Sequence, residues 1–132
     1  MLKAERVRRF IPGLTSVVLI ATSLWVAPSL ALAEDGALLF SDTCAICHSP
    51  EPGVNKLGPS LAGVVGRPAG SLKDYSYSEA MQKAGLTWTR LMLDRWIANP
   101  QAVVKGTKML FAGLNNAAER KAIIDYLATL KN

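Results

Sequence analysis

The sequence has few residues that could crosslink a small protein: two cysteines and one histidine among 132 residues. Two cysteines exclude a fold held together by several disulfides. Together with a single histidine, they cannot supply the four side chains of a structural zinc site. No segment alternates apolar and polar residues over the length that a sheet needs. The length suits one domain, and we expect that domain to be all-α.

The chain also lacks a cluster of basic residues interleaved with aromatic ones. Its formal net charge is +5, but the excess is concentrated at the start. Residues 1–33 hold four basic residues and one acidic residue, a net of +3, whereas residues 34–132 hold 11 basic and 9 acidic residues, a net of +2. This distribution argues against a nucleic-acid partner.

The first 33 residues have the layout of a secretory signal peptide. A basic stretch, Met1–Arg9, precedes the 24 uncharged residues Phe10–Ala33, which end in Ala31-Leu32-Ala33. Small residues at that point favour cleavage after Ala33, which would leave a domain over residues 34–132. The alternative is an uncleaved membrane anchor, because a span needs about 20 apolar residues. Both interpretations place the domain outside the cytoplasm, in the periplasm.

Helix-capping residues and apolar spacing predict four helices separated by long loops. We expect helices from Asp35 to about Cys44, from Ser78 to about Ala84, from after Thr87 through residues 90–98, and after Asn115 or Asn116. Residues 49–70, rich in proline and glycine, and residues 101–114 are expected to be loops. Such long loops are unusual in a domain of this size. They indicate that the chain wraps around something that is not protein.

The unusual chemistry lies in Cys44-Ala45-Ile46-Cys47-His48. The pattern C-x-x-C-H is the attachment signature of c-type haem. Two thiols three residues apart on one turn can each bond a vinyl group of one porphyrin, and His48 can then bind the iron. A Cys44–Cys47 disulfide, a redox-active thiol pair and a metal site are the alternatives. Export from the cytoplasm favours haem, because haem is attached to such motifs outside the cytoplasmic membrane.

The second axial position of the iron cannot be filled by another histidine of this chain. The candidates are Met81, Met92, Met109, a lysine or an open position. Met92 lies within a predicted helix, where methionine commonly fills gaps in an apolar core. Met109 lies in a predicted loop, which can bring its thioether over the haem without distorting a helix. We expect Met109 to be the ligand.

In these features the sequence resembles class I cytochrome c of the mitochondrial and bacterial c2 or c550 type. The resemblance covers residues 35–130 and includes Gly36, Phe40, the C-x-x-C-H motif, Leu57-Gly58-Pro59-Ser60-Leu61, Gly66-Arg67, Tyr75-Ser76-Tyr77-Ser78, Leu86-Thr87-Trp88, Asn99-Pro100, Gly106-Thr107-Lys108-Met109 and Phe111-Ala112-Gly113. It implies an all-α cytochrome c fold, with the first and last helices crossing and loops wrapped around one covalent haem.

The resemblance implies a role for each of eight residues. Cys44 and Cys47 form the thioethers, and His48 and Met109 are the axial ligands. The other four residues contact either the haem or its histidine ligand. The Pro59 carbonyl accepts a hydrogen bond from His48, and the haem propionates are contacted by Arg67, Tyr77 and Trp88. Thr107 and Trp96 are expected to line the Met109 side, and Gly36 and Phe40 to pack against Tyr126 and Leu127.

Two departures from the family stand out. Met81 occupies a position where the family often has a buried asparagine. The ring of lysines around the exposed haem edge is sparse, with Lys56, Lys105 and Lys108 as its matching members. Electrostatic steering toward an acidic partner should therefore be weaker than in a strongly basic cytochrome.

The implied function is that of a one-electron carrier and not of an enzyme. Its partners would be redox proteins that bind transiently: a cytochrome bc1-type complex, an oxidase, a reductase or a dehydrogenase. The protein would be a monomer, bound to a membrane only if the N-terminal segment is retained. The alternative is a haem c protein with an open sixth position, acting as a peroxidase or gas sensor.

Overall fold

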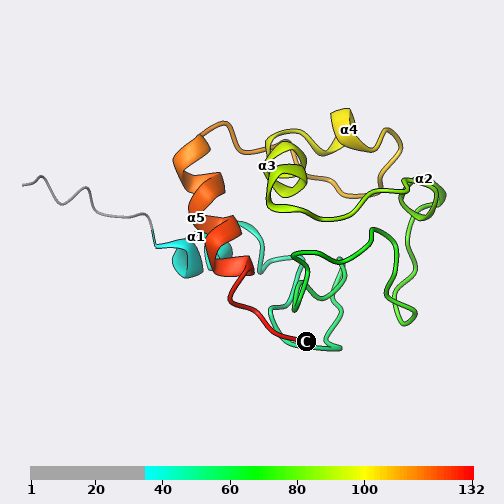
Figure 1. Ribbon diagram of the computed structural model, residues 1–132, viewed down its shortest axis with the longest axis horizontal. Coiled ribbons are helices and arrows are strands. Elements are labelled where there is room, and N and C mark those ends of the chain that lie inside the picture. The colour runs from blue at the N-terminus through cyan, green and yellow to red at the C-terminus, as the bar shows by residue number, and fades with distance from the viewer. Residues whose placement is uncertain (1–34) are drawn as a thin grey trace, which may run out of the picture. The chain divides into compact units, whose positions relative to one another are not determined.

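The computed structural model describes residues 35–132, and within them the chain forms five helices joined by loops (Figure 1). The helices are α1 (Gly36–Thr43), α2 (Glu79–Gln82), α3 (Arg90–Ala98), α4 (Pro100–Val103) and α5 (Ala117–Leu127). The described residues contain no strand beyond an isolated bridge between Pro68 and Thr87. None of their helices is long and apolar enough to cross a membrane. The predicted signal peptide or anchor lies outside the described residues.

Polar side chains begin the helices, as predicted for Asp35, Ser78 and Asn116 but not for Thr89. Asp35 accepts hydrogen bonds from the first turn of α1, at 3.0 Å from Ala37 N and 3.2 Å from Leu38 N. Ser78, Thr89 and Asn116 cap α2, α3 and α5 in the same way. Each cap satisfies amide groups that no helical carbonyl can reach. The four predicted helices are confirmed, although α2 ends at Gln82, two residues before the expected end.

The helix α4 was not predicted, because residues 101–114 were expected to be a loop. Asn99 caps it by accepting from Ala102 N at 3.1 Å, and Pro100 occupies its first turn. Proline fits that position because its missing N–H would have had no helical partner. Pro100 thus ends α3 and starts α4. Four residues are too few to show helical periodicity, so the sequence pattern could not reveal this helix.

The first and last helices cross in close contact, with α5 lying against α1 in Figure 1. At the crossing, a Cβ atom added to Gly36 would lie 2.1 Å from the Ala122 carbonyl oxygen. Only glycine allows this approach. The rings of Phe40 and Tyr126 pack beside it with centroids 5.1 Å apart. The predicted contact between the two ends of the domain is confirmed.

A second set of contacts joins α5 to α3 and to the loop between α4 and α5. Arg120 donates from Nε to Asp94 Oδ1 at 2.7 Å and from Nη1 to the Leu114 and Asn115 carbonyls at 2.9 Å. Its side chain is largely buried, whereas the Lys121–Asp125 pair on the same helix is exposed.

The same loop approaches α3 at a single glycine. Gly113 has a φ of 102°, and a Cβ atom there would lie 2.1 Å from the Ala98 carbonyl oxygen. The positive φ and the close backbone contact both require glycine at this position.

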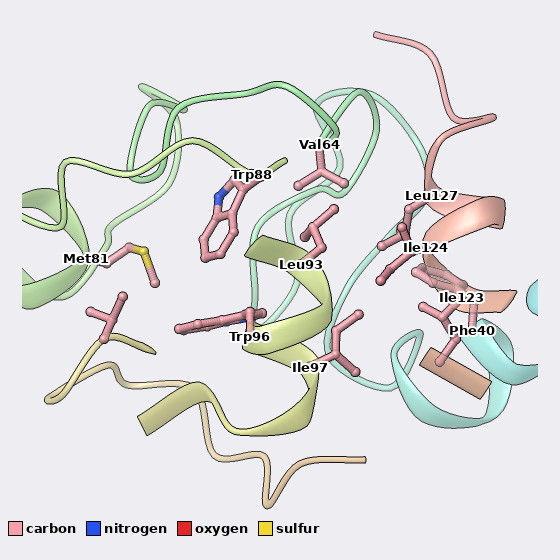
Figure 2. Packing of buried hydrophobic residues seen from close by; sticks show 11 residues of the cluster. Phe40, Val64, Met81, Trp88, Leu93, Trp96, Ile97, Ile123, Ile124 and Leu127 are labelled. Carbon is pink, nitrogen blue, oxygen red and sulfur yellow. The ribbon is translucent and has the colours of Figure 1, made fainter. Parts of the chain in front are cut away.

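Figure 2 shows that the buried core has two parts, with Leu93 of α3 between them. One part lies where α1, α3 and α5 meet and contains Phe40, Ile97, Ile123, Ile124 and Leu127. The other contains Trp88, Trp96 and Met81, and its indole rings are tilted by 60° with centroids 5.1 Å apart. Trp88, Trp96 and Met81 also line the cavity described next.

Candidate cofactor site

A cavity of about 810 Å³ opens among the loops and is closed on one side by α3. This volume lies within the range of about 300–1,000 Å³ that small-molecule and cofactor sites occupy. The cavity is lined by all eight residues that the sequence analysis assigned to haem attachment, iron binding or cofactor contact: Cys44, Cys47, His48, Pro59, Arg67, Tyr77, Trp88 and Met109. The fold therefore brings together residues that are up to 65 positions apart in the chain.

One tight turn positions the two thiols and the imidazole. Cys44 is the C-cap of α1, so Cys47 and His48 lie beyond the end of the helix. Instead, the Cys44 carbonyl accepts hydrogen bonds from Cys47 N at 3.1 Å and from His48 N at 2.9 Å. This turn keeps both sulfurs and the ring at the wall of one cavity. Both cysteines are free thiols, and burial raises the pKa of Cys44 to about 11.

The His48 ring is fixed by a backbone carbonyl. Nδ1 lies 2.8 Å from the Pro59 oxygen, so it carries the proton and donates, which leaves Nε2 with a free lone pair. Burial lowers the pKa of His48 and favours this neutral form, although the hydrogen bond to Pro59 opposes the shift. A neutral imidazole with a hydrogen-bonded Nδ1–H is the usual state of a metal-binding histidine.

Gly58 is a residue whose role the sequence analysis did not identify. A Cβ atom at this position would lie 2.3 Å from His48 Cε1 and 2.6 Å from Nδ1. Its amide donates to the Cys47 carbonyl at 2.8 Å. Any larger residue would push the ring away from the Pro59 carbonyl. The pair Gly58-Pro59 was visible in the sequence, but no local rule connects it to a ring ten residues earlier.

Of the candidate sulfur ligands, Met109 and Met81 both line the cavity, whereas Met92 packs against the core, as expected. Met109 lies on a loop held at two points. Its amide lies 3.3 Å from Thr107 Oγ1, and the Thr107 carbonyl accepts from Gln101 Nε2 at 3.0 Å. Thr107 is itself buried. These bonds fix the backbone of Thr107 and Met109 at the wall of the cavity.

Arg67 provides a positive charge in the cavity wall. Nη1 donates to the Ala62 carbonyl and Nη2 to the Ser60 carbonyl, both at 2.8 Å. These bonds use two of the five N–H groups of a guanidinium. Burial lowers the pKa of Arg67 and raises that of the neighbouring Tyr77. An anionic group in this cavity would meet a fixed cation, which offsets the cost of burying its charge.

These residues fit a haem bound through two thioethers. The lining offers two sulfurs, a neutral imidazole, a loop methionine and a cation, and the remaining walls include the indole rings of Trp88 and Trp96. This combination matches a large apolar group that carries a metal and peripheral anions.

Comparisons with known proteins agree with this assignment. The sequence profile of the cytochrome c family matches residues 33–131. The chain is 50% identical over 88 residues to cytochrome c2 iso-2 of Magnetospirillum molischianum, an alignment that covers 67% of this chain and 91% of that protein. It is 47% identical over 97 residues to cytochrome c2 of Rhodopila globiformis, covering 74% and 92% of the two chains. Among solved structures, cytochrome cH from Methylobacterium extorquens aligns with a TM-score of 0.67 and 41% identity, covering 74% of this chain and 97% of that one.

Proposed function

The chain belongs to the cytochrome c family as a class I member of the c2 type, and from this premise we propose that it is a one-electron carrier with His48 and Met109 as the axial ligands of its haem. It carries covalently attached haem c and takes part in electron transport, as cytochromes c do. The observation that carries the ligand assignment is one cavity that His48 and Met109 both line, with Met109 on a loop whose backbone is held by hydrogen bonds.

The haem supplies the redox chemistry, because its iron accepts and releases one electron. The surrounding residues hold the ligands in place. Pro59 keeps His48 oriented and makes its ring a stronger donor to the metal. The thioether of Met109 is a soft ligand that stabilises Fe(II), and a His/Met pair therefore raises the reduction potential. Cys44 and Cys47 form the two covalent bonds to the porphyrin.

Arg67, Tyr77 and Trp88 are assigned to the haem propionates. All three line the cavity, and Arg67 is locked by its two bonds to backbone carbonyls. The Trp88 amide donates to the Arg67 carbonyl at 2.9 Å, which ties this part of the wall together. A fixed cation and polar groups can stabilise buried carboxylates without large movements when the charge on the iron changes.

The carrier acts outside the cytoplasm. Residues 1–33 direct export and are removed after Ala33, and residues 34–132 form the mature periplasmic monomer. Its partners are redox proteins: a cytochrome bc1-type complex, an oxidase, a reductase or a dehydrogenase. These encounters are brief, because a carrier must leave after each transfer.

Spectroscopy of the protein produced in a periplasm tests the ligand assignment. The oxidised holoprotein should be low-spin with a methionine-to-iron charge-transfer band, and the reduced form should not bind carbon monoxide. Met109→Ala should abolish that band and open the iron to carbon monoxide. The matched control is Met92→Ala, which removes a half-buried methionine that packs against the core and does not line the cavity, and which should retain the band.

Two results would reject this proposal. One is a high-spin wild-type protein that binds carbon monoxide rapidly, as a peroxidase or gas sensor would. The other is a charge-transfer band that survives in Met109→Ala and disappears in Met81→Leu, which would make Met81 the ligand. Mass spectrometry tests the export assignment separately, since the secreted protein should have the mass of residues 34–132 plus one haem.

A further inference from the structure

The loop that carries Met109 is bonded at two points by one side chain, Gln101 of α4. The two ends of its amide reach two adjacent residues of the loop: Oε1 accepts from Gly106 N at 3.2 Å, and Nε2 donates to the Thr107 carbonyl at 3.0 Å. Because one partner is a donor and the other an acceptor, only one orientation of the amide satisfies both. We call this pair of hydrogen bonds the Gln101 clamp.

The clamp starts from a well-anchored element. Asn99 caps α4 and thereby fixes the turn that carries Gln101. Val104 N donates to the Pro100 carbonyl at 3.0 Å, and Thr107 N donates to the Val104 carbonyl at 3.1 Å. These bonds turn the chain back, so that residues 106 and 107 return to the side chain at position 101.

The two groups that the clamp bonds have no backbone partner among residues 35–132. Gly106 has a φ of 89°, a left-handed conformation that favours glycine. A Cβ atom there would lie 3.5 Å from Ala80 Cβ, which is an ordinary contact, so the conformation and not the space requires glycine. Gln101 therefore supplies both hydrogen-bond partners of a turn that no helix or strand stabilises.

A further hydrogen bond connects the clamp to the ligand residue. Thr107, whose carbonyl Gln101 holds, is buried, and its Oγ1 lies 3.3 Å from Met109 N. Met109 lines the cavity, whereas Gln101 does not. On the other side of Thr107, Lys108 donates to the Ser76 carbonyl. The backbone at Met109 is thus held from α4 through Thr107 and from residue 76 through Lys108.

Resting on the axial role proposed for Met109, we propose that Gln101 is a positioning residue that keeps the Met109 loop closed at the cavity. It acts through the backbone of Gly106 and Thr107 and makes no contact of its own with the site. Without the clamp, the loop opens more often while the rest of the domain stays folded, because the lost bonds belong to this loop alone.

The binding of added imidazole to the oxidised holoprotein tests this role, since imidazole can reach the iron only after Met109 has left it. Gln101→Ala should bind imidazole roughly fivefold faster than the wild type or more, because two hydrogen bonds of ordinary strength are lost. The matched control is Gln82→Ala at the end of α2. It removes one hydrogen bond, from Gln82 Nε2 to the Tyr77 carbonyl at 3.3 Å, and should stay within about twofold of the wild type.

Hydrogen exchange in the reduced holoprotein, measured by NMR, observes the clamp independently of the iron. The Gly106 amide should exchange roughly fivefold faster or more in Gln101→Ala, whereas the Ile124 amide within α5 should be unchanged. Gln101→Glu separates the two bonds, because a carboxylate accepts from Gly106 N but cannot donate to the Thr107 carbonyl. In this variant Gly106 should exchange more slowly than in Gln101→Ala, while imidazole should still bind faster than in the wild type.

Faster imidazole binding confined to the Gln101 variants, with the Ile124 amide unchanged, supports the positioning role. The role is rejected if Gln101→Ala binds imidazole as slowly as Gln82→Ala, or if the Gly106 and Ile124 amides accelerate together, as in a general loss of stability. A wild type without the methionine-to-iron band rejects the ligand assignment and the positioning role together. A wild type that has the band but reacts at the same rate as Gln101→Ala rejects the positioning role alone.

Discussion

The close crossing of α1 and α5 depends on the absence of a side chain at Gly36. The substitution Gly36→Ala, which adds one methyl group there, tests this directly. A Cβ atom at residue 36 would lie 2.1 Å from the Ala122 oxygen, whereas ordinary contact begins at 3.4 Å. The helices would have to separate by about 1.3 Å. The atom that blocks the methyl group belongs to the backbone of α5, so no side-chain rotation can relieve the contact.

Two opposing terms set the magnitude. Alanine favours a helix over glycine by up to about 1 kcal/mol, and by less in a first turn. Overpacking costs about 1–3 kcal/mol. Separating the helices also loosens the contact of Phe40, which is 3% exposed, with Tyr126. We expect a net loss of about 1–3 kcal/mol in the free energy of unfolding, and a larger loss for Gly36→Val.

Guanidinium chloride unfolding of the oxidised holoprotein, followed by circular dichroism, measures this loss. The control is Ala37→Val, which adds two methyl groups at the neighbouring exposed position of the same helix. It should cost no more than about 0.5 kcal/mol, as surface changes usually do. If Gly36→Ala unfolds at the same midpoint as Ala37→Val, or is more stable than the wild type, the close crossing is not the reason for glycine here.

Three further predictions use the same unfolding assay or related ones. Arg120→Ala should lose about 1–3 kcal/mol because it removes a largely buried side chain that donates three hydrogen bonds. Lys121→Ala, which removes an exposed ion pair, should lose less than about 0.5 kcal/mol; equal losses would contradict this. Gly113→Ala should destabilise by more than about 2 kcal/mol through its positive φ and its contact with α3, and a stable variant would refute both reasons. Replacing Cys44 and Cys47 together by serine should abolish covalent haem and most of the helical dichroism, because an apolar cavity of about 810 Å³ cannot stay open to water; a fully helical, colourless protein would be the contrary result.

Much of the local structure was predictable because its causes lie within a few residues. Asp35, Ser78, Thr89 and Asn116 accept hydrogen bonds from amides two or three positions ahead, so short sequence windows contain both partners. The haem attachment motif is equally local, since Cys44 to His48 form one turn. The family resemblance added Pro59, Arg67, Tyr77 and Trp88, and the structure places them in the same cavity.

Other features depend on segments that are distant in the sequence. Met81 and Met92 looked alike as helix residues. Only the packing of α2 and α3 makes Met81 a buried residue in the cavity wall and leaves Met92 half-buried against the core, outside that wall. Gly58 is required because the His48 ring lies against it.

The sequence by itself determined the helix starts, the cofactor chemistry and the charge balance, because each depends on neighbouring residues or on composition. Only the tertiary structure decided which exposed side chains meet at the mouth of the cavity. Ile46, Leu57 and Leu110 come from three separate segments, and hydrogen bonds from Lys56, Tyr75 and Lys108 hold these segments together. The grouping of these side chains, and the hydrogen bonds of the two lysines to backbone carbonyls, follow from long-range contacts that no sequence window contains.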